Sequence, residues 1–135
     1  MPDRRHRRVL VAGSGGFPLD QAIGTEVVDI LRAYPEGTVF LTRARGRFDT
    51  FVSVAAETLG YVVVRFPSPG GSRNWDRDVA MAHEADEAVA FFDPATLHDM
   101  NTGTGHLVEK LLDQRKRVRA YTEAGGHLVF AGEMP

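Results

Sequence analysis

The stretch VLVAGSGG at residues 9–16 decides the fold. VLVAG is a short run rich in β-branched residues, which is typical of a buried strand, and the glycines that follow it end the strand. Further on, apolar residues recur with helical spacing at Ile23, Val27, Ile30, Leu31 and Tyr34. A strand, a glycine turn and an amphipathic helix in this order form the first unit of an α/β sheet.

The same alternation continues to the end of the chain. Further strands are predicted at TVFLT (38–42), YVVVRF (61–66), EAVAFFD (87–93) and RVRAY (117–121), and HLVFA (127–131) is a candidate for a short sixth strand. YVVVRF is nearly all apolar, as expected of a strand that is covered on both faces. Helices are predicted between the strands, including one over 74–84 and one carrying Leu107, Val108, Leu111 and Leu112 on one face.

Strands that alternate with helices predict a parallel sheet with helices on both faces, because parallel neighbours need right-handed crossovers. We therefore predict the α/β class: a single Rossmann-like, doubly wound domain with a mainly parallel sheet of five to six strands and the first strand in the centre. With 135 residues, 43% of them apolar, the chain is long enough for one such core. Residues 1–7 are expected to form a flexible basic tail and residues 8–135 the domain.

The composition limits the kinds of partner that the protein is expected to bind. The formal charge is −2 and the arginines are spread along the chain, which argues against nucleic acid as the main partner. The exception is RRHRR at 4–8, interpreted as a solvated terminus, with contact to nucleic acid as the weaker alternative. There is no cysteine, no signal-peptide core and no apolar run of about 18 residues. The sequence thus predicts a cytoplasmic protein without a membrane partner.

The candidate ligand-binding residues follow the carboxyl ends of four predicted strands. In a doubly wound sheet, ligands bind beyond the carboxyl ends of the strands. Here those ends read GSGGFP (13–18), ARGRFD (44–49), PSPGGSRNWDRD (67–78) and DPATLHDMNTGTGH (93–106). Glycine lets backbone N–H groups approach an anion, hydroxyl groups add donors, and arginine grips phosphate with two parallel bonds. The four ends together predict a nucleotide or phosphate site.

Short motifs in this order also resemble a known family. They are Gly13-Ser14, ARGRFD at 44–49, RDVAM at 77–81 followed by Ala85-Asp86, and Gly103-Thr104. Over roughly residues 8–121 the chain resembles the YspA-type (DUF2493) branch of the SLOG superfamily, a Rossmann-like group that includes the lonely-guy phosphoribohydrolases and the DprA and Smf proteins. The resemblance implies a Rossmann-like fold and a nucleotide-derived ligand.

The chain departs from these patterns at three places. ARGRFD holds one residue more than the ARGxD turn of the family, and Asp78 replaces the asparagine of RNxxM. The lonely-guy enzymes carry a glutamate three positions after the threonine of PGGxGTxxE, where this chain has Leu107. The last departure favours ligand binding over cleavage.

The predicted ligand and phosphate residues come from all of these segments: Gly13, Ser14, Gly15, Arg45, Gly46, Arg77, Asp93, Gly103 and Thr104. Arg45 and Arg77 are the candidates for phosphate, with a surface salt bridge to Asp49 or Asp78 as the alternative. Thr104 is either an anion ligand or a plain helix N-cap, and Asp93 either a ribose contact or a turn residue. Trp75 either stacks on a base or covers the edge of the core.

Two functions are compatible with these residues. The first is the binding of a nucleotide or nucleotide-derived phosphorylated ligand, as in a sensor. The alternative is an enzyme that hydrolyses or transfers the N-glycosidic bond of nucleosides or their monophosphates, with Glu109 or Asp93 as the carboxylate. His83, His98 and His106 lack the paired spacing of zinc ligands, so neither a metal nor a cofactor is expected. The catalytic residues stay unassigned, and a homo-oligomer is left open.

Overall fold

The computed structural model describes residues 6–14, 16–43, 46–67, 73–92 and 103–134. Ten elements follow one another along the chain: β1 (Arg8–Gly13), α1 (Gln21–Arg32), β2 (Val39–Thr42), α2 (Gly46–Thr58), β3 (Val62–Arg65), α3 (Arg73–Glu84), β4 (Glu87–Phe91), α4 (Gly103–Asp113), β5 (Arg117–Ala124) and β6 (His127–Met134).

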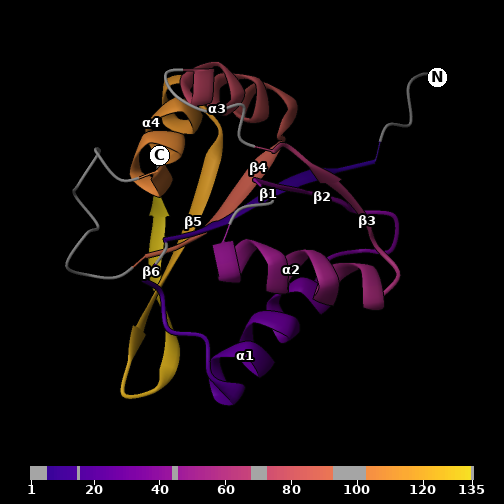
Figure 1. The fold of residues 1–135 in the computed structure, drawn as a ribbon, viewed down its shortest axis with the longest axis vertical. Helices are drawn as coiled ribbons and strands as arrows, with labels where there is room; N and C mark the ends of the chain where they lie inside the picture. The colour runs from indigo at the N-terminus through magenta and orange to yellow at the C-terminus, as the bar shows by residue number, and fades with distance from the viewer. Residues whose placement is uncertain (1–5, 15, 44–45, 68–72, 93–102, 135) are drawn as a thin grey trace.

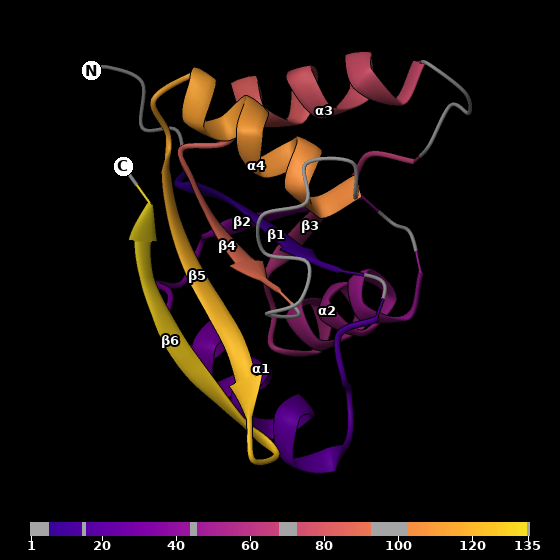
Figure 2. The ribbon, with the colours of Figure 1, turned by 90° about the vertical axis from the view of Figure 1, so that its left-hand side faces the viewer.

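The strands form one sheet in the order β3-β2-β1-β4-β5-β6. β1 to β5 run parallel and β6 runs antiparallel to β5. Helices α1 and α2 cover one face, and α3 and α4 cover the other (Figures 1 and 2). The predicted Rossmann-like α/β fold is confirmed, with β1 between β2 and β4. Strand order reverses at β1, so the ligand region of such folds lies at the carboxyl end of this strand.

The core is divided by the sheet into two clusters. Successive side chains of a strand point to opposite faces. Val9 and Val11 accordingly pack with α1 and α2, whereas Leu10 and Ala12 pack with α3 and α4, and all four are fully buried. This arrangement explains why VLVAG has no polar position, and it fixes the carboxyl end of β1 between the two helix layers.

The edge strand β3 differs from the prediction. Val62 is 61% exposed and Val64 is 41% exposed, although the apolar run indicates cover on both faces. Val64 pairs with Leu41, which belongs to the cluster beneath α3 and α4. These two helices pack on β1, β4 and β5, further along the sheet, so the outer strand stays uncovered on that face.

The last strand is longer than predicted. The expected strand at 127–131 extends over His127–Met134 and returns along β5 through a turn at Gly125 and Gly126. Both glycines have positive φ, which suits a tight hairpin between antiparallel strands. Within the described ranges, no helix has the length and apolar character needed to cross a membrane.

The described part of the basic N-terminal stretch contacts the domain. Arg7 pairs with Glu87, and Arg8 pairs with Glu84. The backbone N–H of Arg8 also donates to the carboxylate of Asp86 at 2.8 Å. These contacts lie at the amino ends of β1 and β4, at the opposite edge of the sheet from the predicted ligand region.

Candidate functional site

A buried arginine joins three segments at the carboxyl edge of the sheet. Arg43 directly follows β2 and is only 4% exposed. Its Nη2 donates to the carbonyl oxygen of Gly13 at 2.7 Å and to Oγ1 of Thr104 at 3.1 Å. Its Nε donates to Oδ2 of Asp49 at 3.1 Å. One guanidinium therefore connects the end of β1, the first turn of α2 and the first turn of α4.

The surroundings of Arg43 balance its buried charge. Asp49 is fully buried and lies in the first turn of α2, where the helix dipole favours a carboxylate. A guanidinium only donates hydrogen bonds, so Thr104 accepts in its bond with Arg43 and keeps its own hydroxyl hydrogen as a donor. The arrangement leaves a hydroxyl donor at the start of α4, the end of a helix that favours anions.

Gly13 has a packing role beside its place at the strand end. A Cβ atom at this position would lie 2.4 Å from Cδ1 of Phe48, which is far inside van der Waals contact. Phe48 in turn packs on Phe91 of β4, with ring centroids 4.9 Å apart. Glycine at the end of β1 thus lets the first turn of α2 lie directly against the sheet.

A second buried cluster connects α3 with α4. Arg77 Nε donates to Oδ1 of Asp78 at 3.1 Å, and Oδ2 of Asp78 lies 2.6 Å from Nδ1 of His106. The side chains of Arg77 and His106 are 5% and 10% exposed. Trp75 stands edge-on to His106, with 3.7 Å between ring centroids. The two helices thereby enclose a cation and an imidazole around one carboxylate.

Two nitrogen atoms of this cluster have no hydrogen-bond partner within the described part of the chain. They are Nη1 of Arg77 and Nε2 of His106, and both are inaccessible to solvent. The carboxylate of Asp78 accepts hydrogen bonds, so Nδ1 of His106 carries a hydrogen and Nε2 is the second ring nitrogen. A buried charged group with an unmade bond is costly. Arg77 and His106 are therefore the groups at this edge that are suited to contact a ligand.

The structure brings several predicted residues together. Gly13 and Thr104 meet at Arg43, and Arg77 lies in the neighbouring cluster. The two clusters are joined through α4, because His106 follows Thr104 by two residues and Gly103 begins the helix. Gly15, Arg45 and Asp93 lie outside the described residues.

Two other predicted residues have structural roles. The backbone N–H of Ser14 donates to the carbonyl oxygen of Phe91 at 3.0 Å, which continues the pairing of β1 with β4. That N–H group is therefore engaged within the sheet. Gly46 begins α2 with φ of 73°, a conformation that glycine adopts without strain, and it is exposed.

For Arg77, Asp49 and Trp75, the structure shows which neighbours each side chain contacts. Arg77 does pair with Asp78, but the pair is buried and not on the surface. Asp49 pairs with Arg43. Trp75 is 55% exposed, contacts the ring of His106 and has the ammonium of Lys110 5.5 Å from its ring centroid, so it lies over the second cluster.

Neither Arg43 nor His106 is among the ligand residues predicted from the sequence. Arg43 had one usable signal: it lies two residues after Leu41 on a buried strand, so a strand that continued would place its side chain inside. Its partner Asp49 lies six residues later, beyond the start of the helix. For His106 no local signal exists, because its partner Asp78 is 28 residues away.

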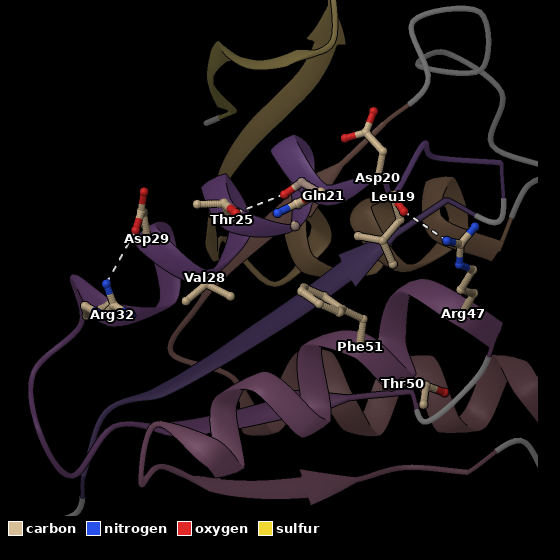
Figure 3. Close-up of a pocket in the computed structure, with 11 residues that line it drawn as sticks. Leu19, Asp20, Gln21, Thr25, Val28, Asp29, Arg32, Arg47, Thr50 and Phe51 are labelled. Atoms are coloured by element: carbon tan, nitrogen blue, oxygen red, sulfur yellow. Dashed lines mark hydrogen bonds and ion pairs between the residues drawn. The ribbon is translucent and has the colours of Figure 1, made fainter.

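An apolar groove lies elsewhere, between α1 and α2 (Figure 3). It has a volume of about 700 Å³ and is lined by Leu19, Val28 and Phe51, with Arg47 at its rim donating to the carbonyl oxygen of Leu19. Of the predicted phosphate residues that the structure describes, none lines it. Among the described residues, no group of three histidine or acidic side chains is placed to hold a metal ion.

Comparisons with known proteins leave the family open. No family model matches the chain, and no curated protein matches it. Among solved structures, the fold is similar to that of an uncharacterized protein from Alicyclobacillus acidocaldarius subsp. acidocaldarius DSM 446. The two share 11% identity with a TM-score of 0.45, over 94% of this chain and 78% of the other.

Proposed function

We propose that this protein binds a nucleotide or nucleotide-derived phosphorylated ligand, as in a sensor, where α3 and α4 meet the carboxyl edge of the sheet. The observation that carries the proposal is the buried guanidinium of Arg77, whose Nη1 has no partner within the described residues. A phosphate oxygen is the acceptor that such a group matches best, because the bond is charge-assisted and the guanidinium stays ionised.

Neighbouring groups add to the proposed phosphate site. Thr104 keeps a hydroxyl hydrogen after accepting from Arg43, and it lies in the first turn of α4. The N-terminus of a helix attracts anions through its unpaired N–H groups and its dipole. The region also lies at the carboxyl end of β1, where strand order reverses, the usual ligand position in doubly wound sheets.

The residues of α4 give less support to cleavage of an N-glycosidic bond. Leu107, which stands where the lonely-guy hydrolases carry glutamate, is fully buried in the core beneath α3 and α4. The carboxylate of Glu109 lies 3.5 Å from the ammonium of Lys110. Asp93 lies outside the described residues. Binding without turnover is therefore the function that we propose.

The first experiment is a thermal-shift screen with AMP, ADP-ribose, NAD and cyclic nucleotides. A ligand that binds only the folded state raises the melting temperature by mass action. If no compound of the panel shifts the melting temperature, the proposal is wrong.

The second experiment measures the contribution of Arg77. Arg77→Lys keeps a positive charge but cannot form the two-pronged contact, and Arg77→Met removes the charge. We expect Arg77→Met to weaken the binding of the shifting nucleotide by about tenfold or more, since a hydrogen bond to a charged group contributes roughly 1.5–3 kcal/mol. Arg32→Met, at an exposed pair with Asp29, is the control and should bind normally. Equal affinity of both Arg77 variants and the wild type, with intact melting curves, would contradict the site.

A further inference from the structure

His106 and Arg77 both contact the carboxylate of Asp78, so the protonation state of His106 decides the net charge of this cluster. At this edge the other buried ionisable groups of the described chain form two matched pairs, Arg43 with Asp49 and Arg77 with Asp78. Their formal charges cancel. A phosphate monoester carries a charge of about −1.5 to −2 near neutral pH, which a buried site of zero net charge does not offset.

The imidazole can take up a proton at one atom only. Nδ1 already carries the hydrogen that faces Asp78, so an added proton has to go to Nε2, the nitrogen without a partner in the described chain. Among the described residues, the other charged groups near His106 are the guanidinium of Arg77, the ammonium of Lys110 beside Trp75, and Arg43, which contacts Thr104. Among the described residues, Asp78 is the only carboxylate in direct contact with the ring.

We propose that His106 is a phosphate-contacting residue and that the site binds a dianionic phosphate together with one proton, which is held between Nε2 and a phosphate oxygen. This inference rests on the proposed function and specifies its ligand class. A phosphate monoester such as AMP would bind as the dianion with the imidazolium. A phosphodiester, with one negative charge, would gain less from the added proton.

Isothermal titration calorimetry in two buffers of different ionisation enthalpy counts the protons taken up on binding. AMP is titrated at about pH 8, where its phosphate is already a dianion, so a proton taken up on binding goes to the protein. Sulfate serves as a second probe, because it stays a dianion and contributes no protons of its own. We expect the wild type to take up about one proton for each AMP or sulfate bound, and its affinity to fall by up to about tenfold per pH unit wherever this uptake is complete.

Two substitutions separate proton uptake from binding. His106→Gln can place an amide N–H near the position of Nε2 but does not titrate, so it should bind AMP without proton uptake and with little dependence on pH. His106→Asn can keep the donor to Asp78 but has no atom at Nε2, so its affinity should fall by about tenfold or more. Melting curves report whether each variant folds.

The outcomes distinguish the inference from the proposed function. Binding of AMP to the wild type without proton uptake, or with equal uptake by His106→Gln, overturns the role of His106 and leaves phosphate binding intact. Absence of any binding of AMP, sulfate and the nucleotides of the thermal-shift panel to the wild type overturns both. Uptake that disappears in His106→Gln supports the inference.

Discussion

The indole of Trp75 stands edge-on to the imidazole of His106, 3.7 Å away between ring centroids and at an interplanar angle of 72°. Trp75 is the only tryptophan of the chain. Its fluorescence therefore reports on one place in the molecule, the cover of the cluster formed by Arg77, Asp78 and His106.

This pair predicts a fluorescence signal that reports ligand binding beside His106. A change of charge next to an aromatic ring perturbs its electrons, so Trp75 emission should change as AMP is added. The measurement is emission against AMP concentration at one pH. His106→Asn, which we expect to bind about tenfold more weakly, should need correspondingly more AMP for the same change. His83→Asn, at an exposed position of α3, should respond as the wild type does. Equal midpoints for both variants would assign the signal to another group.

Removal of the Arg43 charge should destabilise the protein strongly. Arg43→Met leaves Asp49 ionised and buried without its cation, and the loss of one partner of a buried ion pair costs about 3–5 kcal/mol. Urea denaturation measures the change in the free energy of unfolding. The control is Arg65→Met, at an exposed pair with Glu57, which should shift the midpoint little. Similar shifts for both variants would show that Arg43 does not hold the edge together.

Addition of one methyl group at Gly13 should disturb the packing of Phe48. The new Cβ of Gly13→Ala would lie 2.4 Å from the ring, so α2 has to move, at a cost of about 1–3 kcal/mol. Gly16→Ala is the matched control, because a Cβ atom there would meet no other atom within 4 Å and the backbone has no positive φ. Thermal melting compares the two. A Gly13→Ala protein as stable as Gly16→Ala would contradict the close approach.

Acid should weaken the contact between α1 and the β5–β6 hairpin. The backbone N–H of Leu128 donates to Glu26 at 2.6 Å and His127 contacts the other carboxylate oxygen at 3.0 Å, and these bonds lower the pKa of Glu26 below its usual 4.5. A lowered carboxyl pKa stabilises the fold above the unfolded value and loses this contribution as the pH falls through the folded value.

The measurement for Glu26 is the melting temperature between pH 3 and 7. Above about pH 5 the wild type should melt higher than Glu26→Gln by a constant difference, and this difference should shrink as the pH falls below 4.5. Glu36→Gln, at an exposed position, is the control. A difference that stays constant down to pH 3 would exclude this carboxylate as the cause.

The sequence was sufficient to predict the fold class and the central position of β1, but not the contacts of the site. Runs such as VLVAG predict buried parallel strands, because helices cover both faces of such a strand and leave no position for a polar side chain. The exposed valines of β3 could not be foreseen, since cover depends on where α3 and α4 pack. The same holds for Asp78 and His106, which meet only because two helices lie side by side. Gly13 and Thr104 were expected at the same edge, because the carboxyl ends of parallel strands lie there together. The sequence did not predict that Arg43 links them.

The bonds of Arg43 also lead to an expectation about how the molecule opens. Its partners Gly13 and Thr104 are 30 and 61 residues away along the chain, so the bonds form only after the sheet and both helix layers are assembled. Withdrawal of α4 alone would leave the guanidinium without one acceptor and uncover the edge beneath it. Slow hydrogen exchange at α4 should therefore match that of β1 and β2 instead of reporting an independent local fluctuation. A ligand held at this edge would then slow exchange throughout the domain.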